Sequence, residues 1–272
     1  MTPASEAKCW MLVSDLDGTL LGDSDATARF QDLWDRTLRR GRLVYASGRQ
    51  YDSVVSSINE HRLPIPDAII ADVGTDVRLY STGASMISWT TRWWSTWEME
   101  RISRILDNRP GFTLQPSHCQ TAYKRSYFVE NAPSGWLSQT RCQLRMQNIN
   151  AELVYSSNRD LDVLPAGVHK GSAVEFLARH WQIPRARVVV AGDSGNDLSM
   201  FVQGYSGIVV GNAQSELGNL NGPNVYRSAF DFADGVIDGV RYWSKNGLAR
   251  FCLDQDSVEK IDNGFALPPL IS

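Results

Sequence analysis

L-V-S-D-L-D-G-T-L-L, at residues 12–21, is the stretch that decides the fold. Its apolar start is typical of a short buried strand, and Asp15 and Asp17 follow with one residue between them. Gly18 then allows the chain to turn sharply away. Ligands of open α/β sheets bind at the carboxyl ends of the strands, so we expect both carboxylates at a ligand-binding edge.

The two carboxylates favour a bound cation. Side chains this close repel each other unless a cation or a shared proton lies between them. Magnesium is a hard ion that prefers oxygen ligands, so Asp15 and Asp17 indicate Mg²⁺. An acidic turn after a strand would carry the same residues without a metal, and the choice depends on the rest of the chain.

Length and composition indicate a globular protein with a sizeable core. The 272 residues allow one large domain or two smaller ones, with 43% hydrophobic and 21% charged residues. A net charge of −3 gives no reason to expect nucleic acid or an anionic membrane as a partner. No apolar run is long enough to span a bilayer.

The cysteines and the first residues predict a cytoplasmic protein. Cys9, Cys119, Cys142 and Cys252 are scattered and lack C-x-x-C spacing, which argues against a metal site or a disulfide framework. Residues 1–7 are polar, so we expect no secretory signal.

Apolar runs and helical periodicity alternate along the chain, as in a parallel α/β sheet. Strands are expected at 43–46, 68–71, 188–191 and 208–210, and helices at 25–40, 51–61, 171–181 and 230–243. Runs at 77–80 and 86–89 resemble a hairpin. Between these segments the composition changes, and we predict a core of residues 1–86 and 165–272 interrupted by a cap of residues 87–164.

Four tryptophans crowd the start of the predicted cap: Trp89, Trp93, Trp94 and Trp97. Such rings can stack on a sugar, but an aromatic-rich helix more often packs against its own sheet. We therefore favour a packing role for these side chains.

Four groups of polar residues fall at predicted strand ends or helix starts: Asp15 with Asp17, Ser47, Lys170, and Asp193 with Asp197. Each alone has an ordinary explanation, such as a turn, a solvated charge or a helix cap. Together, D-x-D-G-T, a lysine and G-D-S-G-N-D resemble the haloacid dehalogenase superfamily of phosphohydrolases. The resemblance implies an α/β, Rossmann-like core with a parallel sheet and an inserted α+β cap of the C2 type.

The same resemblance implies a role for each group. Asp15 would attack phosphorus and form an aspartyl-phosphate, and Asp17 would act as general acid and then as general base. Mg²⁺ would be held by Asp15, the main-chain carbonyl of Asp17, Asp193 and Asp197. Phosphate oxygens would be bound by Ser47, Lys170 and Asn196.

Further motifs resemble sucrose-6-phosphate phosphatases: residues 15–23, 45–49, 73–75, 160–165 and 212–214. Residues 22–27, 155–157 and 233–237 resemble the bacterial mannosylfructose-phosphate phosphatases within that group. Both substrates are disaccharides phosphorylated on fructose. The substrate-binding residues implied are Gly48, Arg49, Gln120, Lys124, Asp160 and Asp162. Lys124 could instead form a surface ion pair with one of these acids, which would contribute little.

The leading hypothesis is a Mg²⁺-dependent phosphatase that acts on a fructose-containing disaccharide phosphate, with its sugar-phosphate synthase as a candidate partner. A broad-range sugar-phosphate phosphatase or a phosphomutase is the alternative among enzymes. A non-catalytic regulator of the synthase is the alternative of another class. Retention of the predicted acid/base, Asp17, argues against the last.

Overall fold

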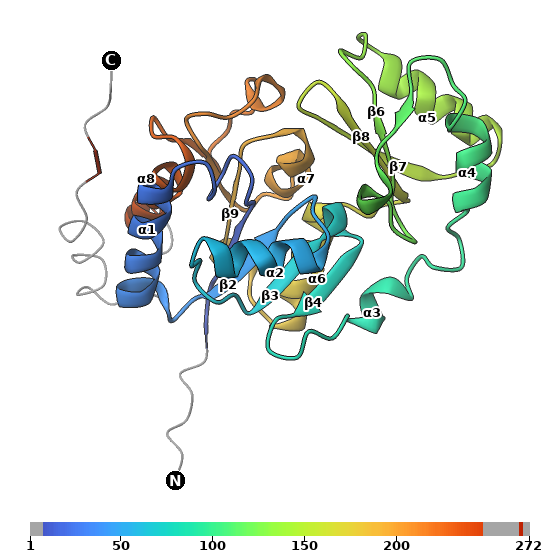
Figure 1. Cartoon of the computed structure of the whole chain (residues 1–272). Coiled ribbons are helices and arrows are strands. Elements are labelled where there is room, and N and C mark those ends of the chain that lie inside the picture. The colour runs from blue at the N-terminus through green and yellow to red at the C-terminus, as the bar shows by residue number, and fades with distance from the viewer. Residues whose placement is uncertain (1–7, 247–266, 269–272) are drawn as a thin grey trace.

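The computed structural model describes residues 8–246, 267 and 268, and it contains two β-sheets side by side (Figure 1). The predicted core ranges extend beyond these residues at both ends. The larger sheet is built from the first and last parts of the described chain, and the smaller one from the segment between them.

The larger sheet has the strand order β11-β10-β9-β1-β2-β3-β4, and all neighbouring strands are parallel except β3 and β4. Its strands are β1 (Met11–Ser14), β2 (Arg42–Ala46), β3 (Ala68–Ala71), β4 (Asp76–Leu79), β9 (Val188–Gly192), β10 (Ser206–Val209) and β11 (Val225–Arg227). Successive side chains point to opposite faces, so Leu12 and Val13 enter separate hydrophobic clusters. The sheet is therefore covered on both sides, as the near-continuous apolar strands predicted.

Helices cover the two faces. Phe30 of α1 (Ser24–Leu33), Val54 of α2 (Tyr51–Glu60) and Val236 of α8 (Phe232–Asn246) belong to one cluster. Val174 of α6 (Lys170–His180) and Met200 of α7 (Leu198–Phe201) belong to the other. A π-helix at Trp34–Leu38 extends α1 toward the end of the predicted helix. This layered α/β arrangement is the predicted fold class.

The predicted hairpin at 77–80 and 86–89 is confirmed only at its turn, where Arg78 and Ser85 form an isolated antiparallel bridge and Met86 N–H donates to Val77 O at 2.8 Å. β4 pairs antiparallel with β3, and the second run forms α3 (Ile87–Thr90) instead of a strand. The chain reverses between β3 and β4 through η2 (Asp72–Gly74), where all three residues have positive φ angles. This tight reversal places β4 beside β3, and Met86 and Trp89 of the second run pack in the same hydrophobic cluster as Val77 of β4.

The smaller sheet is antiparallel, in the order β5-β6-β8-β7. Its elements are β5 (Thr113–Leu114), β6 (Arg125–Phe128), β7 (Ala151–Ser156) and β8 (Asp160–Pro165), with α4 (Met99–Leu106) and α5 (Trp136–Met146). Leu106 and Leu144 of the helices pack with Tyr127 and Leu161 of the strands in a third hydrophobic cluster. This unit therefore has a core of its own.

The tryptophans at the start of the predicted cap act mainly in packing. Trp89 and Trp93 are buried against the larger sheet, and the Trp89 indole donates a hydrogen bond to Gly74 O at 2.8 Å. Trp97 packs against the core of the smaller unit. Trp94 is 61% exposed. This agrees with the packing role favoured from the sequence.

Candidate active site

Three neighbouring strands bring the predicted polar groups together. β1 lies between β2 and β9, and Ser14 is in register with Tyr45 and Ala191. Asp15 and Asp193 immediately follow β1 and β9, and Ser47 follows β2. Residues far apart in the chain therefore meet at one edge of the sheet, as predicted from the carboxyl-end rule.

Lys170 lies at the centre of this group and is fully buried. Its Nζ donates to Asp15 Oδ1 at 2.7 Å, Asp197 Oδ1 at 2.7 Å and Asn196 Oδ1 at 2.5 Å. Lys170 is the first residue of α6, where a positive charge is unfavourable because of the helix dipole. The surrounding oxygens compensate, and the Asp15 and Asp197 charges hold the pKa of Lys170 above its usual value although burial alone would lower it.

The acidic loop after β9 is fixed by main-chain donors. Asp197 Oδ2 accepts hydrogen bonds from the main-chain N–H groups of Asp193 at 3.0 Å and Ser194 at 3.2 Å. Asp193 Oδ1 accepts from the Thr19 hydroxyl at 3.0 Å. Gly18 has a φ of 81°, and a Cβ there would lie 2.5 Å from Asp193 Oδ2. The glycine of D-x-D-G-T is therefore required both by its backbone conformation and by its contact with the distant acid.

The three buried carboxylates fit a hard divalent cation. Ligand atoms of Asp15, Asp193 and Asp197 lie within 4.8 Å of one another. Burial and the Asp197 charge raise the pKa of Asp193 to about 7. Burial chiefly, with the charges of the other two acids, raises the pKa of Asp15 despite the nearby Lys170. Three acids face one lysine, and this excess negative charge is what an oxygen-liganded Mg²⁺ would neutralise.

Asp17 lies apart from these three carboxylates. Its side chain is 49% exposed and forms a two-point ion pair with Arg49, whose Nε donates to Asp17 Oδ2 at 2.7 Å. Arg49 also donates to the Ser57 hydroxyl at 2.7 Å. The Asp17 carboxylate thus faces the open side of the site, and participation of its main-chain carbonyl in metal binding stays a prediction.

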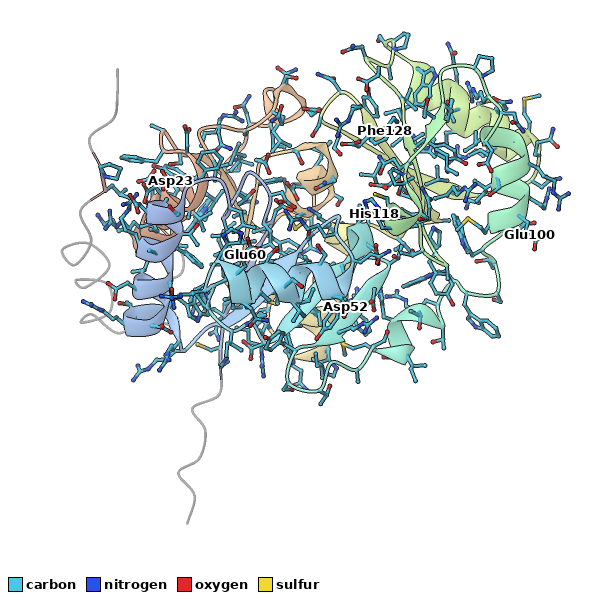
Figure 2. All side chains as sticks on the ribbon, viewed as in Figure 1. Asp23, Asp52, Glu60, Glu100, His118 and Phe128 are labelled. Atoms are coloured by element: carbon cyan, nitrogen blue, oxygen red, sulfur yellow. The ribbon has the colours of Figure 1, made fainter. Side chains whose placement is uncertain are left out.

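A cavity of about 530 Å³ opens between the two sheets beside these groups. Its lining includes six residues predicted from the sequence: Gly48, Arg49, Lys124, Asp160, Asp162 and Asn196. In Figure 2 the labelled side chains of His118 and Phe128 lie on the unit of the smaller sheet, and Asp52 lies across on α2. His118 and Phe128 line the cavity, so both units contribute to it.

Lys124 is buried, contrary to the surface ion-pair alternative. It is 4% exposed, and its Nζ donates to Gly48 O at 2.9 Å and lies 3.3 Å from Asp72 Oδ1. Burial raises the pKa of Asp72 to about 6, although the Lys124 charge opposes this. The pair joins the cap segment to the reversal between β3 and β4.

Gln120 differs from the other predicted sugar-binding residues. Its amide donates to Gln115 O at 3.0 Å and Ser126 O at 2.9 Å, and its Oε1 accepts from Ser126 N–H. These hydrogen bonds therefore stabilise the loop before β6. Gln120 lines a second cavity next to the 530 Å³ one.

Several residues that line the 530 Å³ cavity were not predicted: Gln115, His118, Phe128, Ser156 and Arg159. Phe128 stands opposite Asp160 on the neighbouring strand, and Gln115 donates to Asp160 Oδ1 at 3.0 Å. A correct strand register for 125–128 and 160–165 would have indicated Phe128, because directly opposed residues are neighbours.

Among the described residues, Cys9, Cys119 and Cys142 form no disulfide bond, and Cys252 lies outside these residues. In the part of the chain that the structure describes, no helix has both the length and the apolar character needed to cross a bilayer.

A family model described as sucrose-6F-phosphate phosphohydrolase matches residues 8–244. The chain belongs to this family. Its fold is that of the haloacid dehalogenase phosphatases, and it is a phosphoric monoester hydrolase. Membership in a family of phosphatases argues against the non-catalytic alternative.

Two relatives differ in how much of their length the chain covers. It is 36% identical to the mannosylfructose-phosphate phosphatase of Agrobacterium fabrum, over 87% of this chain and 97% of that protein. It is 28% identical to the probable sucrose-phosphatase 3b of Arabidopsis thaliana, over 86% of this chain but 59% of the plant protein. This chain therefore matches only part of the length of the plant protein.

Structural comparison supports the same family. The X-ray structure of the sucrose-phosphatase from Synechocystis sp., in complex with sucrose and phosphate, matches with a TM-score of 0.82 and 26% identity. The match covers 87% of this chain and 98% of the Synechocystis chain. The match therefore extends over nearly the whole Synechocystis chain.

Proposed function

We propose that this chain removes phosphate from a fructose-containing disaccharide phosphate, with sucrose-6-phosphate and mannosylfructose-6-phosphate as the candidate substrates. The observation that carries the proposal is the position of the 530 Å³ cavity. Its lining includes Arg49, which pairs with Asp17, and Asn196, which accepts a hydrogen bond from Lys170. Polar side chains of the smaller sheet line the same cavity. The cavity is large enough for a disaccharide, because small-molecule pockets usually measure about 300–1,000 Å³.

In the proposed mechanism Asp15 is the nucleophile. A carboxylate oxygen of Asp15 attacks phosphorus, the bond to the sugar oxygen breaks, and the phosphoryl group is transferred to Asp15. Asp17 donates its proton to the departing sugar oxygen and then accepts a proton from the water that hydrolyses the aspartyl-phosphate. Asp17 is about half exposed, and its carboxylate would leave the two-point pair with Arg49 to carry the proton between substrate and water.

The surrounding residues compensate the phosphate charge. Lys170, Asn196 and Ser47 would bind phosphate oxygens, and Lys170 donates a hydrogen bond to Asp15 at 2.7 Å. Asp15, Asp193 and Asp197 would hold Mg²⁺. When bound, Mg²⁺ reduces the repulsion between the Asp15 carboxylate and the anionic substrate.

We further propose that residues 87–164 form a cap that recognises the sugar. Asp160 and Asp162 are two residues apart on β8 and line the same cavity, as alternate residues of a strand do. Arg49 and Gly48 line it from the side of the larger sheet. Association with a synthase stays a prediction.

The test is a comparison of substrates. Purified protein is assayed for phosphate release from sucrose-6-phosphate, mannosylfructose-6-phosphate, fructose-6-phosphate and glucose-6-phosphate, with Mg²⁺ and with EDTA. We expect kcat/KM for one disaccharide phosphate to exceed that for both hexose phosphates by at least about tenfold, and EDTA to abolish turnover. Equal kcat/KM values would favour the broad-range phosphatase, and interconversion of hexose phosphates without phosphate release would favour the phosphomutase.

A further inference from the structure

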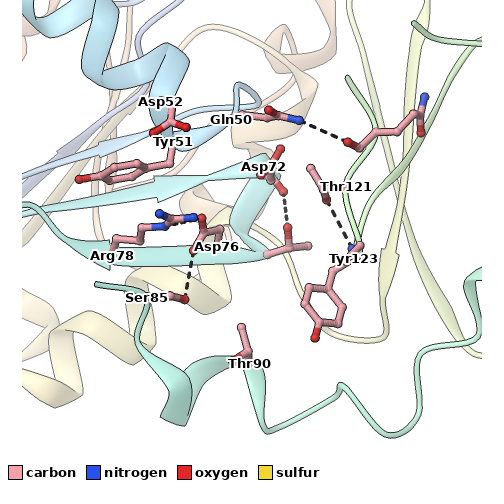
Figure 3. Close-up of a pocket in the computed structure, with 13 residues that line it drawn as sticks. Gln50, Tyr51, Asp52, Asp72, Asp76, Arg78, Ser85, Thr90, Thr121 and Tyr123 are labelled. Atoms are coloured by element: carbon pink, nitrogen blue, oxygen red, sulfur yellow. Dashed lines mark hydrogen bonds and ion pairs between the residues drawn. The ribbon is translucent and has the colours of Figure 1, made fainter. Parts of the chain in front are cut away.

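A second cavity, of about 440 Å³, lies beside the Asp72–Lys124 ion pair (Figure 3). Asp72 lines this cavity and Lys124 lines the 530 Å³ cavity, so the ion pair is part of the wall between them. The larger sheet contributes Asp72, Asp76 and Arg78, and the cap segment contributes Thr121 and Tyr123. The mechanism proposed above uses none of these five side chains.

We propose that this second cavity binds an unphosphorylated sugar, namely the disaccharide released by the reaction. The choice of this sugar rests on the proposed function, whereas the existence of the site rests on the cavity. Product bound there would make the enzyme sensitive to the product concentration, while the substrate site stays free.

The lining has the chemistry that recognises a polyhydroxylated molecule. Thr90, Thr121 and Ser85 present hydroxyl groups, and Figure 3 shows their side chains around the same space as Tyr123. The Gln50 amide bridges the two sides by donating to Gln120 O at 3.2 Å. Hydroxyls, amides and carboxylates hydrogen bond to sugar hydroxyls, and a tyrosine ring offers an apolar face to the C–H groups of the sugar.

An ion pair forms the buried part of the wall. Asp72 is 5% exposed, and its Oδ1 lies 3.3 Å from the Lys124 ammonium. A neutral sugar would leave this pair intact and would bond to the more exposed polar side chains of the lining.

The charges of the cavity select against a phosphorylated sugar. Asp52, Asp72 and Asp76 line it together with one cation, Arg78, which pairs with Asp76 at 2.7 Å. Asp72 pairs with Lys124 at 3.3 Å, so the three acids exceed these two cations by one negative charge. A phosphate dianion would be repelled by this excess charge, whereas a neutral sugar would not. The lining therefore distinguishes the product of the proposed reaction from its substrate.

A metal ion is a poorer occupant. Among the described residues, Asp15, Asp193 and Asp197 are the group whose ligand atoms converge within 4.8 Å, and the acids of this cavity form no such group. Dispersed carboxylates suit the separate hydroxyl groups of a sugar better than one cation.

An occupant would influence the active site through shared walls. A sugar that contacts Asp76 on β4 and Thr121 in the cap segment would fix the separation of the two sides. Exchange of substrate and product in the neighbouring cavity requires that separation to vary. We therefore expect the free disaccharide to lower kcat as well as raise KM, giving mixed rather than purely competitive inhibition.

The first experiment measures stoichiometry by equilibrium dialysis with radiolabelled sucrose and, separately, labelled mannosylfructose. Thr90→Trp fills the second cavity, and Thr91→Trp is the matched control because Thr91 is exposed and absent from the lining. We expect two sugars per chain for the wild type and for Thr91→Trp, and one for Thr90→Trp. One sugar per chain in the wild type, or two in Thr90→Trp, would overturn the proposal.

The second experiment tests selectivity without relying on a cavity-filling substitution. In the Asp15→Asn background, which prevents hydrolysis, the free disaccharide should occupy two sites and its phosphate ester one. Equal stoichiometry for the two ligands would contradict the charge argument.

Phosphate-release assays separate this proposal from the proposed function. If no disaccharide phosphate is hydrolysed while dialysis still gives two sites, the function fails and the second site stands. If hydrolysis occurs and Thr90→Trp binds as many sugars as the wild type, the second site fails.

Discussion

Replacing Lys170 by methionine tests whether this buried ammonium holds the acidic group together. Methionine keeps an unbranched chain of similar length but removes the charge. Lys170 Nζ lies 2.7 Å from an oxygen of Asp15 and 2.7 Å from one of Asp197. At an effective dielectric constant of about 20, each contact contributes about 6 kcal/mol of Coulomb attraction.

Most of that attraction is offset by the desolvation of the ammonium. Removing one partner of a buried ion pair typically destabilises a protein by about 3–5 kcal/mol, because the remaining charges stay buried. Domains have total stabilities of about 5–15 kcal/mol, so Lys170→Met should lose a large fraction of the free energy of unfolding. Without Mg²⁺, urea denaturation should show this loss directly.

Mg²⁺ should reverse much of the loss, because the variant lacks the ammonium group that pairs with Asp15 and Asp197 in the wild type. At a concentration of about 100 times its Kd, Mg²⁺ would restore about 2.7 kcal/mol. Turnover should nevertheless fall at least about 100-fold, since a positive group near the phosphate is lost. The Mg²⁺-induced rise in Tm should therefore be larger in Lys170→Met than in the wild type.

Lys8→Met is the matched control. Lys8 pairs with Asp67 at 2.8 Å, but its side chain is 35% exposed, so we expect a loss below about 1 kcal/mol. The reasoning would be refuted if the two variants were equally stable in EDTA, or if Mg²⁺ stabilised Lys170→Met no more than the wild type.

Four further predictions follow from the site. Asp15→Asn should lower kcat about 10⁴-fold or more with an unchanged circular dichroism spectrum, and near-normal turnover would disprove the nucleophile. Gly18→Ala should destabilise the protein by about 1–3 kcal/mol and weaken Mg²⁺ binding in calorimetry, because the new methyl would lie 2.5 Å from Asp193 Oδ2; an unchanged Mg²⁺ affinity would contradict this. Lys124→Ala should raise KM for the disaccharide phosphate about tenfold while p-nitrophenyl phosphate hydrolysis is unaffected; equal KM values would remove Lys124 from the sugar site. Burial raises the pKa of Asp72 to about 6, so the folded state binds this proton more tightly than the unfolded state. Its contribution of up to about 3 kcal/mol is present below about pH 4 and lost as the pH rises to about 6. Asp15 and Asp193, whose pKa values are also raised, lose stability over the same range, so urea titrations should show a loss in Asp72→Asn that is smaller than in the wild type by up to about 3 kcal/mol.

The parts of the fold that depend on local pattern were predictable. Apolar runs ending in polar residues located β2, β3, β9 and β10, because a strand buried on both faces leaves a continuous apolar signal. The pairing of the strands was harder to predict from the sequence. The partner of β4 depends on positive φ angles at Asp72 and Val73. Aspartate adopts such angles only in a minority of cases and valine rarely, so the sequence signal for this reversal is weak.

The same distinction applies to the candidate site. Asp15, Ser47, Lys170 and Asp193 follow strands or start a helix, so their meeting at one sheet edge follows from topology. The burial of Lys124 against Asp72 depends instead on how the smaller sheet lies on the larger one. Only the three-dimensional packing distinguishes that buried pair from a surface one.

The central place of β1 has a consequence for synthesis on the ribosome. β1 pairs with β2 soon after both emerge, but its other edge pairs with β9, which follows the whole smaller sheet in the chain. At a synthesis rate of about 5–20 residues per second, β9 is made on the order of ten seconds after β1, and the second edge of β1 stays unpaired for that time. During this interval an apolar strand with unpaired main-chain groups is open to aggregation, so the nascent chain is expected to be a client of ribosome-associated chaperones.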